Sequence, residues 1–310
     1  MPLRAYRASG ADLPFGRPER AHGVPFEGYY WRIVHPERGH VVVAIGADCR
    51  GWGMATLAAH PGGFARTRVE PVAVADPHAF GITVGGALRG DALGVHADLG
   101  PDARLDVTLH DVVRWPRRRL GALGLAHAVP GLPQYWQPVV LHARVRGRAR
   151  IGRDVVELDG ALAYAEKNWA HAFPDHWWWG HAAAFGEPDV MAAFAGGRVR
   201  LAATPAAPTA VVVRLGGALL ALAPPLARTD VAAGASGWRL RTRALGGLRV
   251  ELEGEPGAAA HVLEVPVPGE RRTVPRSHQH LAGRLAVTVR RGRRLRYRGE
   301  SALAGLEHGV

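Results

Sequence analysis

The sequence predicts an all-β protein, and two observations carry this prediction. Apolar and polar side chains alternate with a period of two along several segments of the 310-residue chain, which is the pattern of half-buried antiparallel strands. The 40 glycines and 23 prolines separate these segments at short intervals, as turns do in barrels and sandwiches. The most regular alternation is found in residues 139–146, 238–243, 248–253, 285–290 and 294–298.

Helical periodicity is scarce. Residues 118–128 are expected to form one short helix, which Pro130 and Gly131 would end. The alanine-rich residues 182–195 have helical propensity, but residues 186–189 (GEPD) are typical of a hairpin turn. We therefore expect two strands in that stretch and few helices in the chain.

Two similar blocks predict two domains. Length alone permits one large or two medium domains. Residues 26–31 (FEGYYW) and residues 164–169 (YAEKNW) each combine an acidic residue with aromatics, and alternating apolar segments follow each block. We therefore predict an N-terminal β domain over residues 1–163 and a C-terminal β domain over residues 164–310.

The chain is strongly basic, with 39 Lys and Arg residues against 27 Asp and Glu and a net charge of +12. The basic runs at residues 114–119, 144–150 and 290–298 mostly place arginine on the outward side of predicted strands, where it is solvated. Nucleic-acid binding would need clustered cations interleaved with exposed aromatics, so no nucleic-acid partner is expected. Attraction to an anionic membrane surface is left open. The sequence specifies no oligomeric state.

Cysteine and histidine usage argues against a metal site. Cys49 is the only cysteine, so an intrachain disulfide and a cysteine zinc site are excluded, and a reducing compartment is expected. His278 and His280 would share one strand face, as two zinc ligands do, but no His-x-x-x-His pair or Cys/His cluster accompanies them. We expect polar strand-edge residues there, and no metal.

No segment of the sequence has the length and hydrophobicity of a membrane span. Residues 215–226 are the most apolar, but this stretch is short and Pro224 and Pro225 interrupt it. No apolar core follows Arg4 and Arg7, so a secretory signal is not expected. The expectation is a cytoplasmic protein, with peripheral contact to a membrane left open.

Residues 164–181 (YAEKNWAHAFPDHWWWGH) concentrate the unusual residues of the chain. The segment holds four of the nine tryptophans and three histidines. Lys167 and Asn168 are the only lysine and the only asparagine in the sequence, and they are adjacent. Because lysine and asparagine occur nowhere else in this arginine-rich chain, their adjacent positions point to a functional segment.

Strand geometry assigns these side chains to faces, because successive residues point to opposite sides of a sheet. One face of the first strand would carry Tyr164, Glu166 and Asn168, and the opposite face would carry Lys167 and Trp169. One face of the following strand would carry Trp177, Trp179 and His181. A carboxyl, a phenol and an amide would thus project together beside an aromatic wall.

This arrangement suits the protonation of an alkene. Burial disfavours an ionised carboxyl, so Glu166 could stay protonated near neutral pH and act as a general acid. Aromatic faces would stabilise the carbocation that forms. Two alternatives stay open: a purely structural aromatic cluster, and a structural salt bridge from Glu166 to Lys167 or to an arginine. Because adjacent strand residues point apart, the Lys167 version is disfavoured.

Four sequence blocks resemble those of the tocopherol cyclase family, and they occur in the family order. The most specific is residues 164–179, which resembles the block Y-x-E-K-N-W-G…F-P…W-x-W. Residues 26–30 resemble its F-E-G-W-Y motif, residues 133–137 (PQYWQ) its E-P-H-W-Q segment, and residues 302–309 (ALAGLEHG) its closing A-A-L-E-x-G. The chain departs from the family pattern at Ala170 (Gly in the family), Tyr135 (His) and Tyr29 (Trp).

The resemblance implies two lipocalin-like antiparallel β-barrel domains and a site for a hydrophobic, prenylated or isoprenoid small molecule. It implies cyclisation without a cofactor: Glu166 would protonate an alkene, Tyr164 and Asn168 would orient it, and a phenol oxygen of the substrate would trap the cation in a chromanol-type ring. The residues expected to line the cavity are Trp169, Trp177, Trp179, His181, Glu27, Tyr30 and Trp136. Lys167 is expected to hold the motif together. The wider group includes carotenoid 1,2-hydratases with a Tyr-x-acid pair, so hydration is one alternative, and a non-catalytic lipid carrier is another.

Overall fold

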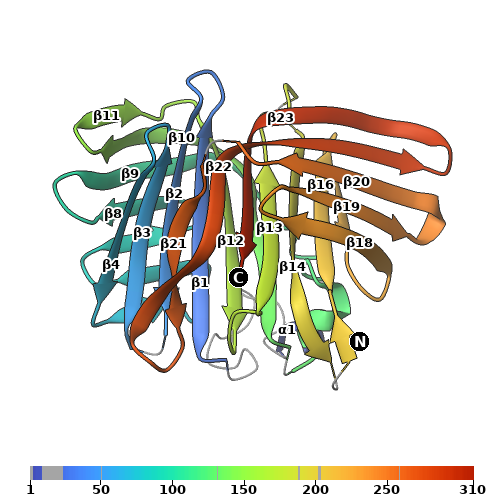
Figure 1. Ribbon diagram of the computed structural model, residues 1–310, viewed down its shortest axis with the longest axis horizontal. Helices are drawn as coiled ribbons and strands as arrows, with labels where there is room; N and C mark the ends of the chain where they lie inside the picture. Colours follow the sequence, from blue (N-terminus) through green and yellow to red (C-terminus); the bar gives the residue numbers. More distant parts are fainter. Residues whose placement is uncertain are drawn as a thin grey trace. The chain divides into compact units, whose positions relative to one another are not determined.

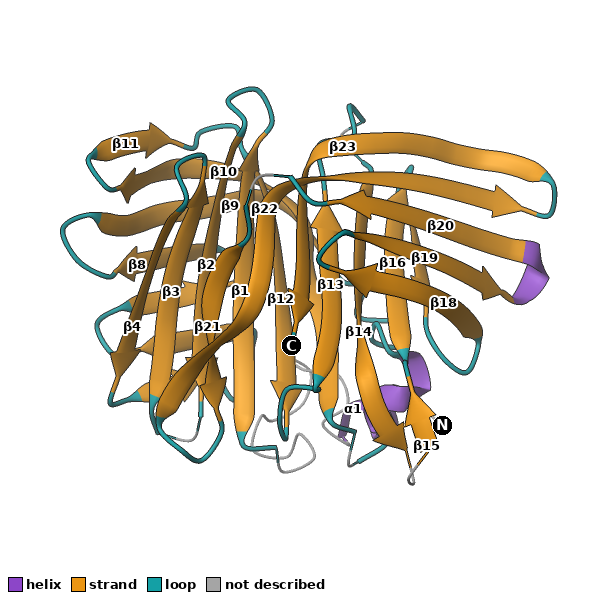
Figure 2. Cartoon of the chain, viewed as in Figure 1, coloured by secondary structure: helices purple, strands orange, loops and turns teal. Residues whose placement is uncertain are grey.

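The computed structural model describes residues 3–8, 24–49, 51–130, 132–187, 189–201, 204–257 and 259–310. These residues form two compact units, each with its own antiparallel sheet (Figure 1). Strands dominate both units, and the helices are short (Figure 2). The predicted all-β class is confirmed.

The division between the units differs from the predicted one. Unit 1 comprises the residues up to Gly121, Leu125–Ala172 and Glu264–Pro275, and unit 2 comprises Ala122–Gly124, Phe173–Leu263 and Arg276–Val310. The expected boundary after residue 163 falls inside strand β12 (Leu162–Ala170), which pairs with unit 1 strands on both sides. Because backbone hydrogen bonds tie β12 to two neighbours, unit 1 continues beyond it.

The sheet of unit 1 runs in the order β4-β3-β2-β1-β12-β10-β9-β8-β7-β6-β5, and β11 pairs with β10. Besides β12, its strands are β1 (Phe26–His35), β2 (His40–Asp48), β3 (Gly53–His60), β4 (Phe64–Glu70), β5 (Ala73–Ala75), β6 (Gly81–Val84), β7 (Leu88–Asp91), β8 (Gly94–Asp98), β9 (Ala103–Arg114), β10 (Gln134–Ile151) and β11 (Asp154–Glu157). β6 contacts β2 and β3, so the sheet curls back on itself as in a barrel. The inward side chains form one core, which includes Trp31, Ile33 and Leu105.

The sheet of unit 2 runs in the order β17-β16-β14-β13-β23-β22-β20-β19-β18, with β15 beside β14 and β21 beside β22. Its strands are β13 (His176–Ala182), β14 (Met191–Leu201), β15 (Thr204–Ala206), β16 (Thr209–Leu215), β17 (Ala218–Leu222), β18 (Ala227–Gly234), β19 (Gly237–Ala244), β20 (Leu248–Glu255), β21 (His261–Val267), β22 (Arg272–Arg291) and β23 (Arg294–Gly309). β16 contacts β18, so this sheet also curls towards closure. Its core includes Trp178, Phe194 and Leu306.

The alternating segments of the sequence lie in strands, as predicted. On β19, Trp238, Leu240 and Thr242 are buried between exposed arginines. Gly292, with a φ of 59°, lies in the turn between β22 and β23. β1 is an exception, because it is buried at every position, and β12 is buried at nearly every position. The middle of the unit 1 sheet is therefore covered on both faces.

In the described part of the chain, the helices are α1 (Leu3–Ala8) and two 3₁₀ segments, η2 (Gly124–Ala128) and η3 (Leu245–Gly247). The helix expected over residues 118–128 is wrong in extent, since the described helical residues there begin at Gly124. Gly124 has a φ of 57°, in the left-handed region, which a continuous right-handed helix does not allow. Of the two strands expected within residues 182–195, the second is confirmed by β14, whereas the first is wrong because β13 ends at Ala182. Among the described residues, none of the helices is long and apolar enough to cross a membrane.

Candidate active site

The predicted catalytic residues lie on β12, in the middle of the unit 1 sheet. β12 is flanked by β1 and β10, and Glu166 lies opposite Tyr30 of β1 and Pro138 of β10. Period-two alternation places Tyr164 and Asn168 on the same face as Glu166. We call the face of these three strands that carries Glu166 the acid face, and the opposite face, which carries Lys167, the lysine face.

The Glu166 carboxyl is held by two aromatic donors. Trp136 Nε1 donates to Glu166 Oε2 at 2.7 Å, and the Tyr164 hydroxyl donates to the same oxygen at 2.5 Å. Glu166 is 3% exposed, so these bonds form away from bulk water, where they are electrostatically stronger. Burial and the adjacent Glu166 raise the pKa of Tyr164 well above its usual value, so the phenol remains a hydrogen-bond donor.

The two donors on one oxygen determine where the carboxyl carries its proton. Glu166 Oε2 accepts from Trp136 and Tyr164, so in the acid form the proton belongs on Oε1. Once the proton has left, the same donors make charge-assisted bonds to the carboxylate, which are stronger than bonds to the neutral acid. The arrangement can therefore give up a proton and hold the charge that results.

Arg32 is a cation on the acid face that the sequence reasoning missed. It is fully buried and lies opposite Tyr164, two residues along β1 from Tyr30. Burial lowers its pKa to about 10, so the guanidinium stays charged at neutral pH. The available signal was an arginine inside the apolar stretch Trp31–Val34. Its charge favours an electron-rich oxygen of a ligand nearby.

Asn168 lies at the end of the acid face, in tight contact with Gly28 of β1. A Cβ at Gly28 would lie 2.5 Å from Asn168 Oδ1, so a glycine is needed to leave room for the amide. Oδ1 is buried, and among the described residues no donor reaches it. The amide oxygen is thus an acceptor that a ligand or a water molecule can use.

The lysine face is built around an ion pair. Lys167 Nζ lies 3.1 Å from Glu27 Oε2, and the Tyr29 hydroxyl donates to that same oxygen at 3.1 Å. Lys167 is 1% exposed, and its ammonium lies 5.0 Å from the centre of the Tyr29 ring and 5.9 Å from that of Trp169. Burial lowers the pKa of Lys167, and the Glu27 carboxylate opposes this shift.

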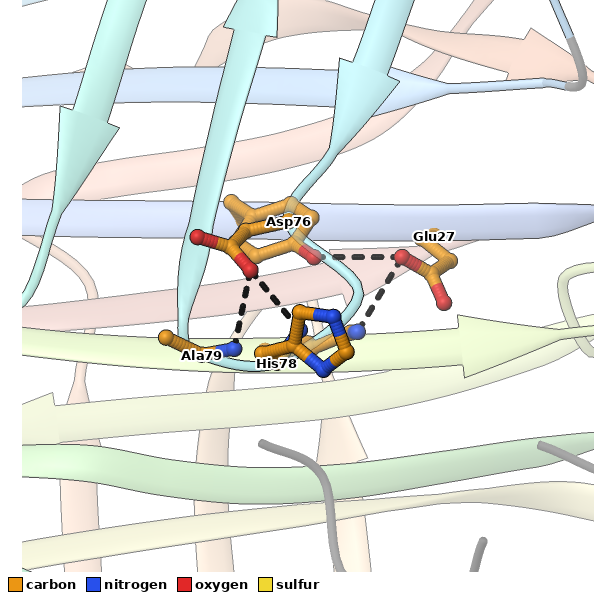
Figure 3. A network of polar contacts seen from close by, with 6 residues as sticks. Glu27, Asp76, His78 and Ala79 are labelled. Atoms are coloured by element: carbon orange, nitrogen blue, oxygen red, sulfur yellow. Dashed lines mark hydrogen bonds and ion pairs between the residues drawn. The ribbon is translucent and has the colours of Figure 1, made fainter. Parts of the chain in front are cut away.

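Figure 3 shows Glu27 beside the turn that carries Asp76. The Asp76 side chain accepts from the backbone N–H groups of His78, at 2.7 Å, and Ala79, at 3.1 Å, which holds the turn in place. Asp76 also adds negative charge that favours the cationic form of Lys167. Because Lys167 pairs with Glu27, it ties β12 to β1, and a salt bridge from Lys167 to Glu166 is wrong.

The structure divides the expected cavity residues of unit 1 between the two faces. Tyr30 and Trp136 share the acid face with Glu166. Glu27 and Trp169 lie on the lysine face, so the structure does not bring them together with Glu166. Strand alternation explains the separation. Trp169 is three residues from Glu166 on β12, and Glu27 is three residues from Tyr30, which lies opposite Glu166 on β1.

Trp169 packs as part of an aromatic stack. It is fully buried, and its ring centre lies 5.4 Å from that of Tyr135, with only 9° between the ring planes. The His127 ring lies on it at 5.4 Å and 24°. His127 in turn contacts the Tyr6 hydroxyl at 3.2 Å. These contacts stabilise the strands on the lysine face.

Trp177, Trp179 and His181 lie on β13, in unit 2. All three are buried. Trp177 Nε1 donates to Glu307 Oε1 at 2.6 Å, and the ring centres of Trp179 and His181 are 6.5 Å apart. These rings are therefore buried on one strand of unit 2, and a wall beside Glu166 stays a prediction.

Glu307 is a second carboxyl that accepts a hydrogen bond from a tryptophan indole, and the sequence reasoning did not single it out. Besides Trp177, Ser277 Oγ donates to Oε1 at 2.9 Å and Gln279 Nε2 donates to Oε2 at 3.0 Å. Burial raises the pKa of Glu307, and the three hydrogen bonds oppose that shift. The available signal was an acidic residue on the alternating closing block, residues 302–309.

The histidines weighed as metal ligands stack on one another. The ring centres of His278 and His308 are 4.9 Å apart with 14° between the planes, and His280 lies 6.3 Å from His308. Within the described part of the chain, no group of three or more His, Cys, Asp or Glu side chains is arranged to hold a metal ion.

The sequence model of the family described as tocopherol cyclase-like matches residues 76–310, which is more than half of the chain. The chain belongs to the tocopherol cyclase-like family. The match includes Glu166 and both of its donors. It begins after β1, so Tyr30 and Arg32 lie outside it. Among curated proteins, none matches this member of the family.

A solved structure shares the fold over nearly the whole length. A protein from Nitrosomonas europaea, described as an AttH candidate, is 14% identical to this tocopherol cyclase-like chain, covers 96% of each chain and has a TM-score of 0.50. At this identity the likeness shows the fold alone, and it agrees with the lipocalin-like all-β architecture. A DUF3598-family protein of unknown function from Nostoc punctiforme is 8% identical over 93% of this chain and 96% of that chain, with a TM-score of 0.17, too low to carry an argument.

Proposed function

We propose that this member of the tocopherol cyclase-like family protonates an alkene of a prenylated aromatic or other polyprenyl lipid and closes a chromanol-type ring. One observation carries the proposal: a buried carboxyl, Glu166, which Trp136 and Tyr164 hold through a single oxygen. The family match supports chemistry of the cyclase or hydratase kind.

The first step is a proton transfer from Glu166. The Oε1–H bond breaks, a C–H bond forms at the less substituted carbon of a trisubstituted alkene, and the π electrons leave a tertiary cation at the other carbon. Trp136 and Tyr164 stabilise the new carboxylate on Oε2 more strongly than they stabilise the neutral acid, which lowers the barrier to this step. Their indole and phenol faces also lie beside the cation.

The second step is the capture of the cation. The phenol oxygen of the substrate forms a C–O bond to the cationic carbon, and its proton returns to the Glu166 carboxylate. Substrate and product are therefore isomers, and the acid is regenerated without an external reactant. The positive charge of Arg32 on the same face attracts the electron-rich phenol oxygen of the substrate. Before capture, Asn168 Oδ1 can accept a hydrogen bond from the phenol hydroxyl.

Hydration is the second candidate, and Asn168 favours it. Its buried Oδ1, which no described donor reaches, can hold a water molecule on the acid face. Such a water would attack the same cation, and Glu166 would take up the released proton. The two reactions share the acid and differ in the nucleophile.

The experiment is incubation of the purified full-length chain with a prenylated hydroquinone, followed by mass analysis of the extracted lipid. Ring closure gives a product of unchanged mass with altered retention, and hydration gives a product heavier by one water molecule. Glu166→Gln, which keeps the size and burial of the side chain, should abolish either product. Glu300→Gln, at an exposed position on β23, is the matched control and should retain it.

Two results would overturn the proposal. Unchanged lipid that copurifies with the wild-type protein would identify a carrier without chemistry. A folded Glu166→Gln protein that turns over at the wild-type rate would show that the proton comes from another group.

A further inference from the structure

Unit 2 contains a cavity of about 640 Å³ at one end of its curled sheet. The lining comes from the start of β13, the end of β18 and its turn into β19, the end of β23 with Val310 after it, Arg198 of β14, and Ala207 ahead of β16. These segments surround the mouth of the unit 2 barrel. Barrel mouths are common small-molecule sites, and this volume lies within the range of ligand pockets.

Trp177 and Trp178 point to opposite faces of β13, and both line this cavity near the end of the strand. Their indole N–H groups are already bonded, to Glu307 at 2.6 Å and to Thr209 at 3.1 Å. The rings are therefore held in position and present apolar surface to the cavity. Gly196 permits this arrangement, because a Cβ there would collide with Trp178 Nε1. This surface is suited to an apolar or aromatic body.

The rim of the cavity carries two basic side chains, and the last residue, Val310, also lines it. Arg198 is exposed and lies directly opposite His176 on the neighbouring strand, and both line the cavity. Among the described residues neither has an ion-pair partner, and the lining contains no Asp or Glu. Two basic groups opposite one another repel when both are charged, and an anion between them would relieve the repulsion.

His308 adds a buried polar atom to the same lining. It lies opposite Trp178, and its Nδ1 is buried with no hydrogen-bond partner among the described residues. Buried polar nitrogens are normally paired, so a ligand atom or a water molecule is expected beside it. The lining of the cavity thus combines apolar indole surface, two basic side chains and the partly buried His308.

We infer that the mouth of the unit 2 barrel binds an amphipathic organic anion. An alkyl, prenyl or aromatic body lies against Trp177 and Trp178, and a carboxylate or phosphate head lies between Arg198 and His176. The site uses none of the residues assigned to proton transfer at Glu166, so it stands or fails independently of the proposed function.

The test is calorimetric titration of the full chain with dodecanoate, dodecanol, acetate and inorganic phosphate. Dodecanoate should bind, dodecanol should bind at least about tenfold more weakly, and acetate and phosphate should not bind measurably. Arg198→Gln should weaken dodecanoate binding by about tenfold or more, since a charged hydrogen bond is lost. Arg200→Gln, two positions along β14 and outside the lining, should leave it unchanged.

Equal affinity for dodecanoate and dodecanol would overturn the anion assignment, as would equal effects of the Arg198→Gln and Arg200→Gln substitutions. Binding of acetate or phosphate as tight as that of dodecanoate would overturn the apolar part. Sedimentation with anionic vesicles, without binding of monomeric dodecanoate, would show a membrane surface instead of a ligand site. His308→Asn provides a second variant in the lining, and weaker dodecanoate binding is expected for it too.

Discussion

Glu166 in unit 1 and Glu307 in unit 2 each accept a hydrogen bond from a tryptophan indole, but the rest of their surroundings differ. The indole of Trp136 and the phenol of Tyr164 donate to the same oxygen of Glu166. Glu307 accepts on both oxygens, from Trp177, Ser277 and Gln279.

The difference separates a group suited to proton transfer from one suited to holding strands together. Trp136 and Tyr164 both reach Oε2 of Glu166, which favours a proton on Oε1, whereas the donors to Glu307 are spread over both of its oxygens. The three donors to Glu307 come from β13 and β22, so this carboxyl links both of these strands to β23. A buried acid paired with an indole is therefore not by itself a sign of catalysis.

The largest expected effect is that of Glu166→Gln on turnover. Loss of a general acid typically costs roughly 10²- to 10⁴-fold in rate, and the amide keeps the hydrogen bonds from Trp136 and Tyr164, so the protein should stay folded. Initial rates with a prenylated hydroquinone, normalised to folded protein, measure this. Turnover within a few-fold of wild type would mean that Glu166, like Glu307, is not the proton donor.

Glu307→Ala should act mainly on stability. Removing the carboxylate leaves Trp177, Ser277 and Gln279 without their acceptor, at an expected cost of about 3 kcal/mol or more in the free energy of unfolding. Denaturant titration followed by tryptophan fluorescence gives the value. Glu300→Ala, an exposed residue on the same strand, should cost at most about 1 kcal/mol. Equal costs for the two substitutions would mean that Glu307 does not link the strands.

Tyr164→Phe should lower turnover less than Glu166→Gln does. It removes one of the two donors that stabilise the carboxylate, which is worth about 1.5–3 kcal/mol, or roughly 10- to 100-fold in rate. Steady-state kinetics should show the loss in kcat more than in KM, because the bond strengthens only as charge develops. Tyr297→Phe in unit 2 serves for comparison, and a loss as large there would point to a general packing effect.

The smallest expected effect is a pH dependence of stability that belongs to Glu307. Burial raises its pKa in the folded protein above the usual 4.5, so the folded state binds this proton more tightly than the unfolded state does. The resulting contribution to stability is present below pH 4.5 and is lost as pH rises through the raised pKa. The difference in unfolding free energy between wild type and Glu307→Gln, measured from pH 4.5 upwards, should show this slope. A flat difference would contradict the direction of the shift.

The parts of the molecule that the sequence predicted are those that depend on neighbours along one strand. Period-two alternation identified β19 and β20, and it placed Tyr164 and Glu166 on one face. β1 and β12 are covered on both faces, so apolar and polar residues do not alternate along them; the β12 block was singled out by its unusual residues, and both blocks by the resemblance to a family.

The parts that escaped prediction depend on strand register. Trp136 reaches Glu166 from 30 residues away, across a pair of strands with bulges near Pro138 and Val140. Trp177 reaches Glu307 from 130 residues away. Neither separation follows from local pattern, because loop lengths and bulges set which residues face one another. The same reason explains why Glu27 was grouped with Glu166 and lies on the opposite face.

The cage around Lys167 also explains a peculiarity of composition. The ammonium is enclosed by the rings of Tyr29 and Trp169 and has the Glu27 carboxylate as its ion-pair partner. A guanidinium would bring five N–H donors and a broad plane into a space suited to a compact charge. Lys167 is the only lysine among the 39 lysines and arginines of the chain. At this position the shape of the site and its hydrogen bonding favour lysine over arginine. The single lysine of the sequence thus lies at a position whose surroundings suit an ammonium and not a guanidinium.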